Sequence, residues 1–196
     1  MVDPYNGYEY VDLGLPSGLK WATCNVGADS PEKAGLYFAW GETTGYTIDD
    51  VTNGVRGFTK DEYNSGPAAS ISTNLTLEQD AAHIHMGGKW RMPTHNEFNE
   101  ILRLSNTTVT WTTNYNGTGV AGRVITSKTN GNSIFLPAAG VCNNSHIFNV
   151  GSEGNYWSSK YNPNGYGYHM SFDSENFTTD YAGVRNVGSS LRGVCE

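Results

Sequence analysis

The last forty residues of the chain, Asn155–Val194, place the tightest constraint on what it can fold into. Within this stretch two kinds of position alternate over short distances. The first kind is aromatic, apolar or small and predicts a rigid frame: Tyr156, Trp157, Ser158, Ser159, Phe172, Gly188, Arg192 and Val194. We expect Trp157 to be buried rather than stacked on a sugar, and Arg192 to partner buried carbonyl groups or a carboxylate.

The second kind of position is polar or aromatic and predicts exposed side chains. These residues are Asn162, Asn164, Tyr166, His169, Ser171, Asp173, Asn176, Thr178, Asp180, Tyr181 and Asn186. Binding loops favour such residues, because Tyr gives large contact area at low entropy cost while Asn and Ser give adaptable hydrogen bonding. We therefore expect a recognition face in which Tyr166 and Tyr181 are exposed anchors.

Length and composition indicate one loop-rich domain. A chain of 196 residues can bury a full core, so a single domain spanning residues 1–196 is expected. Apolar residues are below the globular average, but charged residues are scarce as well, which is not the signature of disorder. Abundant Gly, Asn, Ser, Thr and Tyr predict short strands joined by many turns.

The charge excludes two classes of partner. A formal net charge of −7 and the lack of a Lys/Arg stripe argue against nucleic acid and against an anionic membrane surface. No apolar run approaches the roughly 18–20 residues that span a bilayer, so no membrane insertion of this segment is expected. The sequence does not indicate an oligomeric state.

The start of the chain, MVDPYNGYEY, does not resemble a signal peptide. Either the protein is intracellular, or this is a mature form whose export signal has been removed. We favour the second alternative and expect a cell-surface or extracellular protein.

The three cysteines do not form a disulfide framework, and no CxxC pair suggests zinc. A bridge between Cys24 and Cys195 and a set of free thiols are both compatible with the sequence.

Turn and capping signals divide the first half of the chain. Residues 8–26 predict two short strands around Leu15-Pro16-Ser17-Gly18, and residues 36–40 predict an aromatic piece of core. Residues 41–73 show no sustained hydrophobic periodicity and predict a long surface loop that borders the binding face.

Two helices are expected next. The first covers residues 76–86, and the second begins at the capping box Thr94-x-x-Glu97 and runs to about Arg103. Short strands are expected at residues 107–113, 119–127, 133–137, 166–172, 176–181 and 189–195, with a hairpin turn at Asn130-Gly131. Two helices followed by a run of short strands predict an α+β domain.

Five segments together resemble a bacterial family built on the C-type lectin fold, the "major paralogous domain" group, which is similar to proteins with the fold of the formylglycine-generating enzyme. The segments are VDLGLPSGLKWATCNVG (11–27), YFAWGE (37–42), DAAHIHMGGKWRMPTHNEF (80–98), FLPAAG (135–140) and YWSS…RGVC (156–195). The resemblance covers nearly the whole chain. It implies a C-type-lectin-like fold with paired N- and C-terminal strands, two helices, short strands and many loops.

The C-terminal stretch also resembles the variable region of proteins diversified by retroelements, which rewrite adenines in a template copy. Template Asn codons then become codons for Tyr, Asp, Ser, Thr or His. All eleven positions of the second kind, called soft positions from here on, are Asn or one of these types. This resemblance implies that residues 155–194 are a variable region whose soft side chains bind the ligand.

Motifs for catalysis are weak. His83 and His85 lie two apart on an expected helix and point in different directions, so they do not face one ion. No G-x-S-x-G elbow is present, Glu97 is explained by the capping box, and Glu100 by a solvated helix face. Relatives that oxidise sulfatases use a cysteine pair that we do not carry over to this chain, and no EF-hand-like loop is visible.

These observations predict a non-catalytic protein that needs no cofactor and no metal and recognises a protein or glycan ligand. The alternative is a structural or adhesin-like module of a cell-surface or fimbrial assembly. An enzyme derived from the oxidase-like relatives is the third hypothesis.

Overall fold

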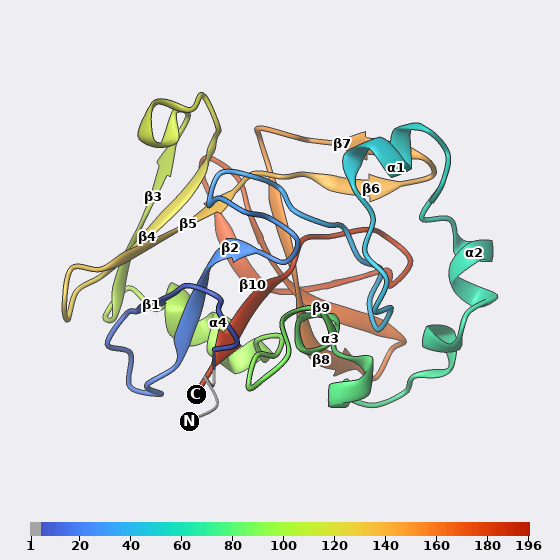
Figure 1. The fold of residues 1–196 in the computed structure, drawn as a ribbon, viewed down its shortest axis with the longest axis horizontal. Helices are drawn as coiled ribbons and strands as arrows, with labels where there is room; N and C mark the ends of the chain where they lie inside the picture. Colours follow the sequence, from blue (N-terminus) through green and yellow to red (C-terminus); the bar gives the residue numbers. More distant parts are fainter. Residues whose placement is uncertain (1–4) are drawn as a thin grey trace.

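The structure is a computed structural model that describes residues 5–196. It is built mainly from short antiparallel strands joined by turns (Figure 1). Its α-helices are α1 (Ile48–Thr52), α2 (Lys60–Asn64), α3 (Ala81–Met86) and α4 (His95–Leu102), with 3₁₀ turns η1 (Pro67–Ser70), η2 (Leu77–Gln79) and η3 (Tyr115–Gly117).

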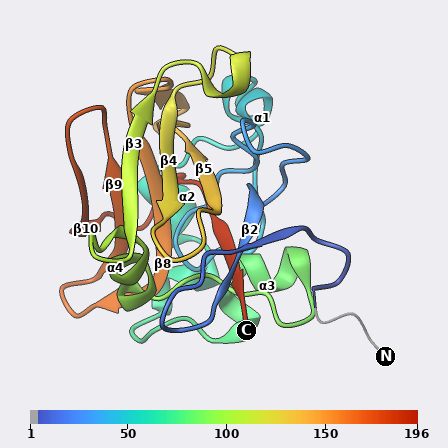
Figure 2. The same ribbon diagram turned by 90° about the vertical axis from the view of Figure 1, so that its left-hand side faces the viewer.

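Eleven strands of the described residues form four antiparallel sheets. The first sheet has the order β1-β2-β11, from β1 (Tyr10–Asp12), β2 (Lys20–Asn25) and β11 (Arg192–Cys195). The second is β3 (Thr107–Thr112), β4 (Gly122–Ser127) and β5 (Ser133–Pro137), and the third is a hairpin of β6 (Val141–Asn143) and β7 (His146–Phe148). The fourth has the order β10-β9-β8, from β8 (Gly154–Asn162), β9 (Tyr166–Phe172) and β10 (Phe177–Gly183), and Figure 2 shows it beside the β3-β4-β5 sheet.

The predicted α+β, C-type-lectin-like fold with two helices is wrong. Residues 5–196 hold four α-helices, the longest of eight residues, and most of the regular structure is in the four small sheets. The early part of the chain and its C-terminal end lie in one sheet, because β11 pairs with β2. The domain is therefore more β-rich than the sequence indicated.

Part of this error lies in residues 41–73, which contain α1, α2 and η1. Thr47 and Asp50 form a capping box at α1, and Thr59 and Glu62 form another at α2. Both signals are visible in the sequence, but helices of five residues are too short to show a helical period.

The predicted helix over residues 76–86 is broken at Asp80, which caps α3 instead of lying inside a helix. One carboxylate oxygen of Asp80 accepts the His83 amide at 2.9 Å and the other accepts the Met92 amide at 2.8 Å. Burial raises the pKa of this carboxyl group. The capping box at Thr94 and Glu97 is confirmed, and Arg91 adds two hydrogen bonds of 2.8 Å to the Glu97 carboxylate.

The strand predictions are largely confirmed. The segments that begin at residues 107, 119, 133, 166, 176 and 189 correspond to β3, β4, β5, β9, β10 and β11, with ends shifted by a few residues. In the turn between β4 and β5 only Gly131 takes a positive φ, of 78°. The expected Asn-Gly turn is therefore present with one left-handed residue.

Two apolar clusters form the core, and β8 contributes side chains to both. Successive side chains on a strand point to opposite faces. On β8, Trp157 packs into the cluster that holds Trp40 and Trp90, whereas Tyr156 packs into the cluster that holds Trp21. The strand that opens the C-terminal stretch is thus fixed from both sides.

The Arg192 side chain joins the first sheet to the β3-β4-β5 sheet. Its guanidinium donates to the carbonyls of Ala22 (2.8 Å) and Thr23 on β2 and to the carbonyl of Phe135 on β5 (2.7 Å). It also donates to the Asn25 side chain at 3.1 Å. The expected role of Arg192 as a partner of buried carbonyls is confirmed, and burial lowers its pKa.

None of the three cysteines forms a disulfide, so no bridge joins Cys24 and Cys195. Cys142 and Cys195 are buried and Cys24 is half-buried. Desolvation raises the pKa of the Cys142 thiol to about 12, which makes it a poor nucleophile.

Replacing Arg192 by Met should lower the free energy of unfolding by roughly 4 kcal/mol or more, because three buried carbonyls lose their donor. Urea unfolding followed by tryptophan fluorescence measures this change. The exposed Arg103→Met variant is the matched control and should change stability by less than about 0.5 kcal/mol. Equal effects of the two substitutions would show that Arg192 does not hold the sheets together.

Candidate ligand-binding surface

Two tight turns order the strands of the C-terminal sheet. Between β8 and β9 the Asn162 side chain accepts the Asn164 amide at 2.9 Å, and Gly165 takes a φ of 88° that favours glycine. Between β9 and β10 the Asp173 carboxylate accepts the amides of Glu175 and Asn176, each at 2.7 Å. These hydrogen bonds lower the pKa of Asp173 and fix the hairpin.

A first group of the predicted site residues borders α2. Asn164, Tyr166 and Asn186 line a hollow of about 300 Å³ together with Lys60 and Asn64. Tyr166 is 39% exposed, as expected for an anchor. Residues 41–73 reach this hollow, because α2 supplies one of its walls. That they border a binding face stays a prediction.

A second group forms a row across the sheet. Trp157 on β8 pairs with His169 on β9, which pairs with Tyr181 on β10. The His169 ring lies 5.4 Å from the Trp157 ring and 6.3 Å from the Tyr181 ring, measured between centroids. Tyr181 is 61% exposed whereas Trp157 is 1% exposed, so the row runs from the core to the solvent.

The environment of His169 disfavours its charged form. Burial lowers the pKa of this imidazole to about 4, although the backbone of Gly167 and the carboxylate of Glu153 act in the opposite direction. At neutral pH His169 is therefore an uncharged ring that supports Tyr181.

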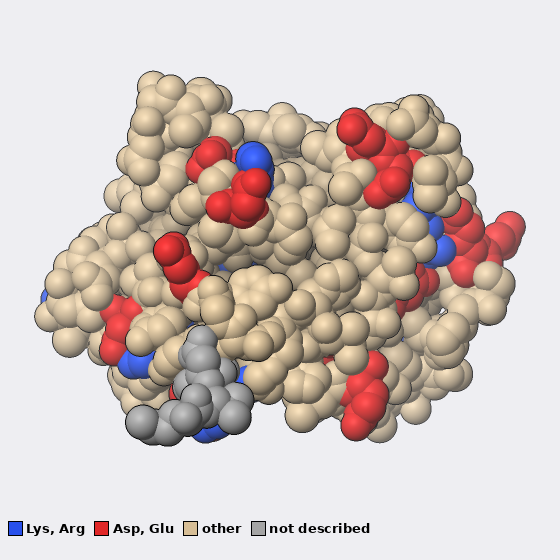
Figure 3. Space-filling model, in the orientation of Figure 1, with Lys and Arg blue, Asp and Glu red and all other residues tan. Residues whose placement is uncertain are grey.

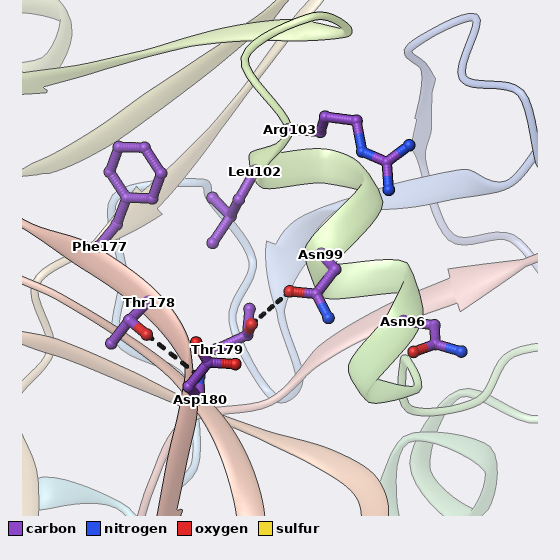
Figure 4. Close-up of a pocket in the computed structure, with 8 residues that line it drawn as sticks. All are labelled: Asn96, Asn99, Leu102, Arg103, Phe177, Thr178, Thr179 and Asp180. Carbon is purple, nitrogen blue, oxygen red and sulfur yellow. Dashed lines mark hydrogen bonds between the residues drawn. The ribbon is translucent and has the colours of Figure 1, made fainter.

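A third group lies at the edge of the sheet. Thr178 and Asp180 line a hollow of about 480 Å³ between β10 and α4, opposite Asn96 and Asn99 (Figure 4). Thr178 pairs with Ser171 and Tyr181 pairs with His169, so Thr179 and Asp180 oppose the single residue between them. This β-bulge turns Thr179 toward α4, where its hydroxyl bonds the Asn99 side chain.

Other predicted site residues have structural contacts. Ser171 is buried and its hydroxyl lies 3.5 Å from the Glu153 carboxylate. Asn186 donates to the Phe58 carbonyl at 3.0 Å, and Asn162 and Asp173 hold the turns described above. Asn176 is exposed at the second turn. The structure thus exposes Asn164, Tyr166, Asn176, Asp180 and Tyr181 most fully.

The sequence did not indicate the residues that α2 and α4 add to these hollows. Lys60 and Asn64 come from α2, and Asn96, Asn99 and Arg103 come from α4 or its end. The capping boxes that begin these helices are readable, but which side chains meet the C-terminal strands depends on tertiary packing.

The described residues give no support to a metal or a membrane span. Among residues 5–196 no group of three or more His, Cys, Asp and Glu side chains is arranged to hold an ion. His83 bonds the Trp90 carbonyl at 2.9 Å and His85 bonds the Thr43 carbonyl at 2.8 Å. Within the same range, every helix is too short or too polar to cross a bilayer.

No family model, curated protein or solved structure matches this chain. The resemblance to diversified proteins therefore stays a prediction from the sequence motifs.

The His169→Phe variant should be less sensitive to acid than the wild type. A histidine with a pKa of about 4 in the folded state and 6.5 in its ordinary state takes up a proton on unfolding, so its contribution is present above pH 6.5 and is lost as the pH falls toward 4. The expected difference is about 3 kcal/mol, because one pKa unit corresponds to about 1.4 kcal/mol.

Urea unfolding of both proteins at several pH values between about 4 and 7 measures this difference. Carboxylates that titrate in the same range contribute equally to both proteins and cancel. Parallel pH profiles for the two proteins would contradict the assignment of a neutral, buried His169.

Proposed function

We propose that this chain is a non-catalytic ligand-binding protein whose C-terminal surface recognises a protein or a glycan. One observation carries the proposal: exposed and buried side chains lie on the same short strands. On β9 Tyr166 is exposed and Met170 is 0% exposed, and on β10 Tyr181 is exposed and Thr179 is 5% exposed. Such a surface can change its side chains without changing the core beneath it.

The chemistry of the exposed residues suits recognition. Tyrosine contributes a large amphipathic area with two side-chain torsions to immobilise, and residues of this type are enriched at binding hot spots. Asn164 and Asp180 lie at the α2 and α4 hollows, where an amide or a carboxylate adds directional hydrogen bonds. Hollows beside exposed aromatic side chains are common features of binding sites.

The resemblance to retroelement-diversified proteins supports the same proposal. It assigns variation to the soft positions and constancy to the frame. Five of the soft positions, Asn164, Tyr166, Asn176, Asp180 and Tyr181, are exposed, and the frame residues Tyr156, Trp157 and Arg192 are buried. The proposed location is the cell surface or the extracellular space.

A module of a surface or fimbrial assembly is the second candidate. β10 is an edge strand, and edge strands offer unpaired backbone groups to another chain. Self-assembly through this edge predicts oligomers whose population rises with concentration in analytical ultracentrifugation. A monomer at all concentrations up to about 100 μM would count against assembly between copies of this chain.

Replacing Tyr166 and Tyr181 together by Ala should weaken ligand binding at least about 100-fold, since each is expected to contribute about 1.4 kcal/mol or more. The melting temperature should change by less than about 2 °C, because both rings are exposed. Binding to arrays of glycans and of proteins, followed by titration of the strongest ligand, measures the first effect.

Tyr8→Ala is the matched control, because Tyr8 is an exposed tyrosine outside the C-terminal stretch. It should keep full affinity. Unchanged binding by the double variant, or unfolding in parallel with lost binding, would contradict the proposal.

A further inference from the structure

The hollow beside α2 differs in charge from the other hollows described. Lys60 and Arg185 line it, and no Asp or Glu does. By contrast, the α4 hollow combines Arg103 with Asp180, and a hollow near Tyr46 combines Arg56 with Glu42, Glu62 and Glu78. The α2 hollow is therefore a basic spot on a protein of net charge −7.

The positive charge of Arg185 is not neutralised by a carboxylate. Its guanidinium donates to the carbonyls of Ile71 (2.7 Å) and Ala69 (3.2 Å). It also faces the rings of Trp40, Tyr63 and Tyr161, with centroid distances of 5.6, 5.5 and 5.8 Å. Among the described residues none of the ion pairs includes Arg185. Carbonyls and rings fix the guanidinium in place but do not neutralise its charge, and Arg185 lines the hollow.

Lys60 adds a second cation that the fold does not require. It is exposed in the first turn of α2, where a cation gains nothing from the helix. Within residues 5–196 no hydrogen bond or ion pair of its ammonium group is found. The neighbouring Glu62 carboxylate accepts the amides of Gly57 (2.9 Å) and Thr59 (2.8 Å) on its own side of the helix. Figure 3 shows acidic side chains around the right-hand end of the molecule, over α1 and α2, with few basic ones among them.

Neutral donors and an aromatic ring complete the site. The side chains of Asn64 and Asn164 have no hydrogen-bond partners among the described residues, and Tyr166 exposes its ring beside them. Two cations, free amides and an aromatic surface suit a carboxylate attached to an apolar or polyhydroxylated body.

We infer that the hollow formed by Lys60, Asn64, Asn164, Tyr166 and Arg185 binds a carboxylate group of the ligand. This inference rests on the proposed function, because Asn164 and Tyr166 belong to the same C-terminal surface. It adds that α2, outside the variable stretch, supplies a charge that selects acidic ligands whatever the soft residues are.

Titration of the ¹⁵N-labelled full chain with two matched pairs of small molecules tests the inference. The first pair is N-acetyl-glutamate N-methylamide and its glutamine analogue, and the second is methyl glucuronoside and methyl glucoside. In each pair only one member carries a carboxylate. We expect the backbone amide signals of Lys60, Asn64 and Tyr166 to shift with an acidic probe, with at least about 10-fold tighter binding than its neutral analogue. A response to only one acidic probe would assign the carboxylate to a peptide or to a sugar.

The Lys60→Gln variant should lose most of this preference, and the exposed Lys89→Gln variant, which removes the same charge elsewhere, should keep it. Both substitutions are at exposed positions and should preserve the fold. Raising the salt from about 50 to 500 mM should weaken binding of the acidic probes alone. Equal shifts for acidic and neutral probes, no shift with any probe, or an unchanged preference in Lys60→Gln would overturn the inference.

Failure of this inference and failure of the proposed function give different results. Tyr181 does not line the hollow. If Tyr181→Ala no longer binds its array ligands and the wild type binds acidic and neutral probes equally, only the inference fails. If the acidic probes bind at the hollow and Tyr181→Ala still binds its array ligands, only the proposed function fails.

Discussion

The fold depends most on the buried guanidinium of Arg192. It is 0% exposed and binds carbonyl groups of β2 and β5, so one side chain fixes two sheets and the last strand. Its partner Asn25 also donates to the Tyr156 hydroxyl at 3.2 Å, and that hydroxyl donates to the Pro137 carbonyl at 3.0 Å. The network therefore extends into β8, where the C-terminal stretch begins. A buried charge is costly unless every donor is satisfied, which leaves little freedom in this arrangement.

The C-terminal surface can be polar and loop-rich because this network and a second arginine hold what lies beneath it. Arg185 fixes residues 68–71 against the segment that follows β10, and Trp157 donates to the Phe38 carbonyl at 2.9 Å from inside the core. The exposed tyrosines add nothing to these contacts. The residues that stabilise the C-terminal stretch therefore differ from the exposed tyrosines proposed for recognition, which is the property expected of a binding surface that varies.

The sequence predicted those parts of the fold that have local signals. The Thr94 capping box, most strands and the burial of Trp157 and Arg192 follow from residue type and spacing. The helices at residues 48–52 and 60–64 were missed because five residues show no period. The fold class was misjudged because the expected helix over residues 76–86 is only a 3₁₀ turn and a six-residue helix, while most of the regular structure is in strands.

Of the candidate site, only the residues that the C-terminal stretch contributes could be predicted from the sequence. Tyr166 and Tyr181 are exposed as expected, but sequence alone did not distinguish Ser171, which is buried, from Asp180, which is exposed. Both are small polar residues on strands, and their exposure depends on strand pairing and on the bulge in β10. Lys60 lines the same hollow as residues more than a hundred positions away, which no local pattern encodes.

The central claim is that a variable surface is carried on a constant frame. The most direct measurement is to read the DNA around the gene for a second copy of the segment that encodes residues 155–194. The account predicts a near-copy that differs only at adenines, with differing codons at exposed positions such as Tyr166, Asp180 and Tyr181 and none at Trp157 or Arg192. The absence of such a copy, or differences in the codons of the buried frame, would contradict it.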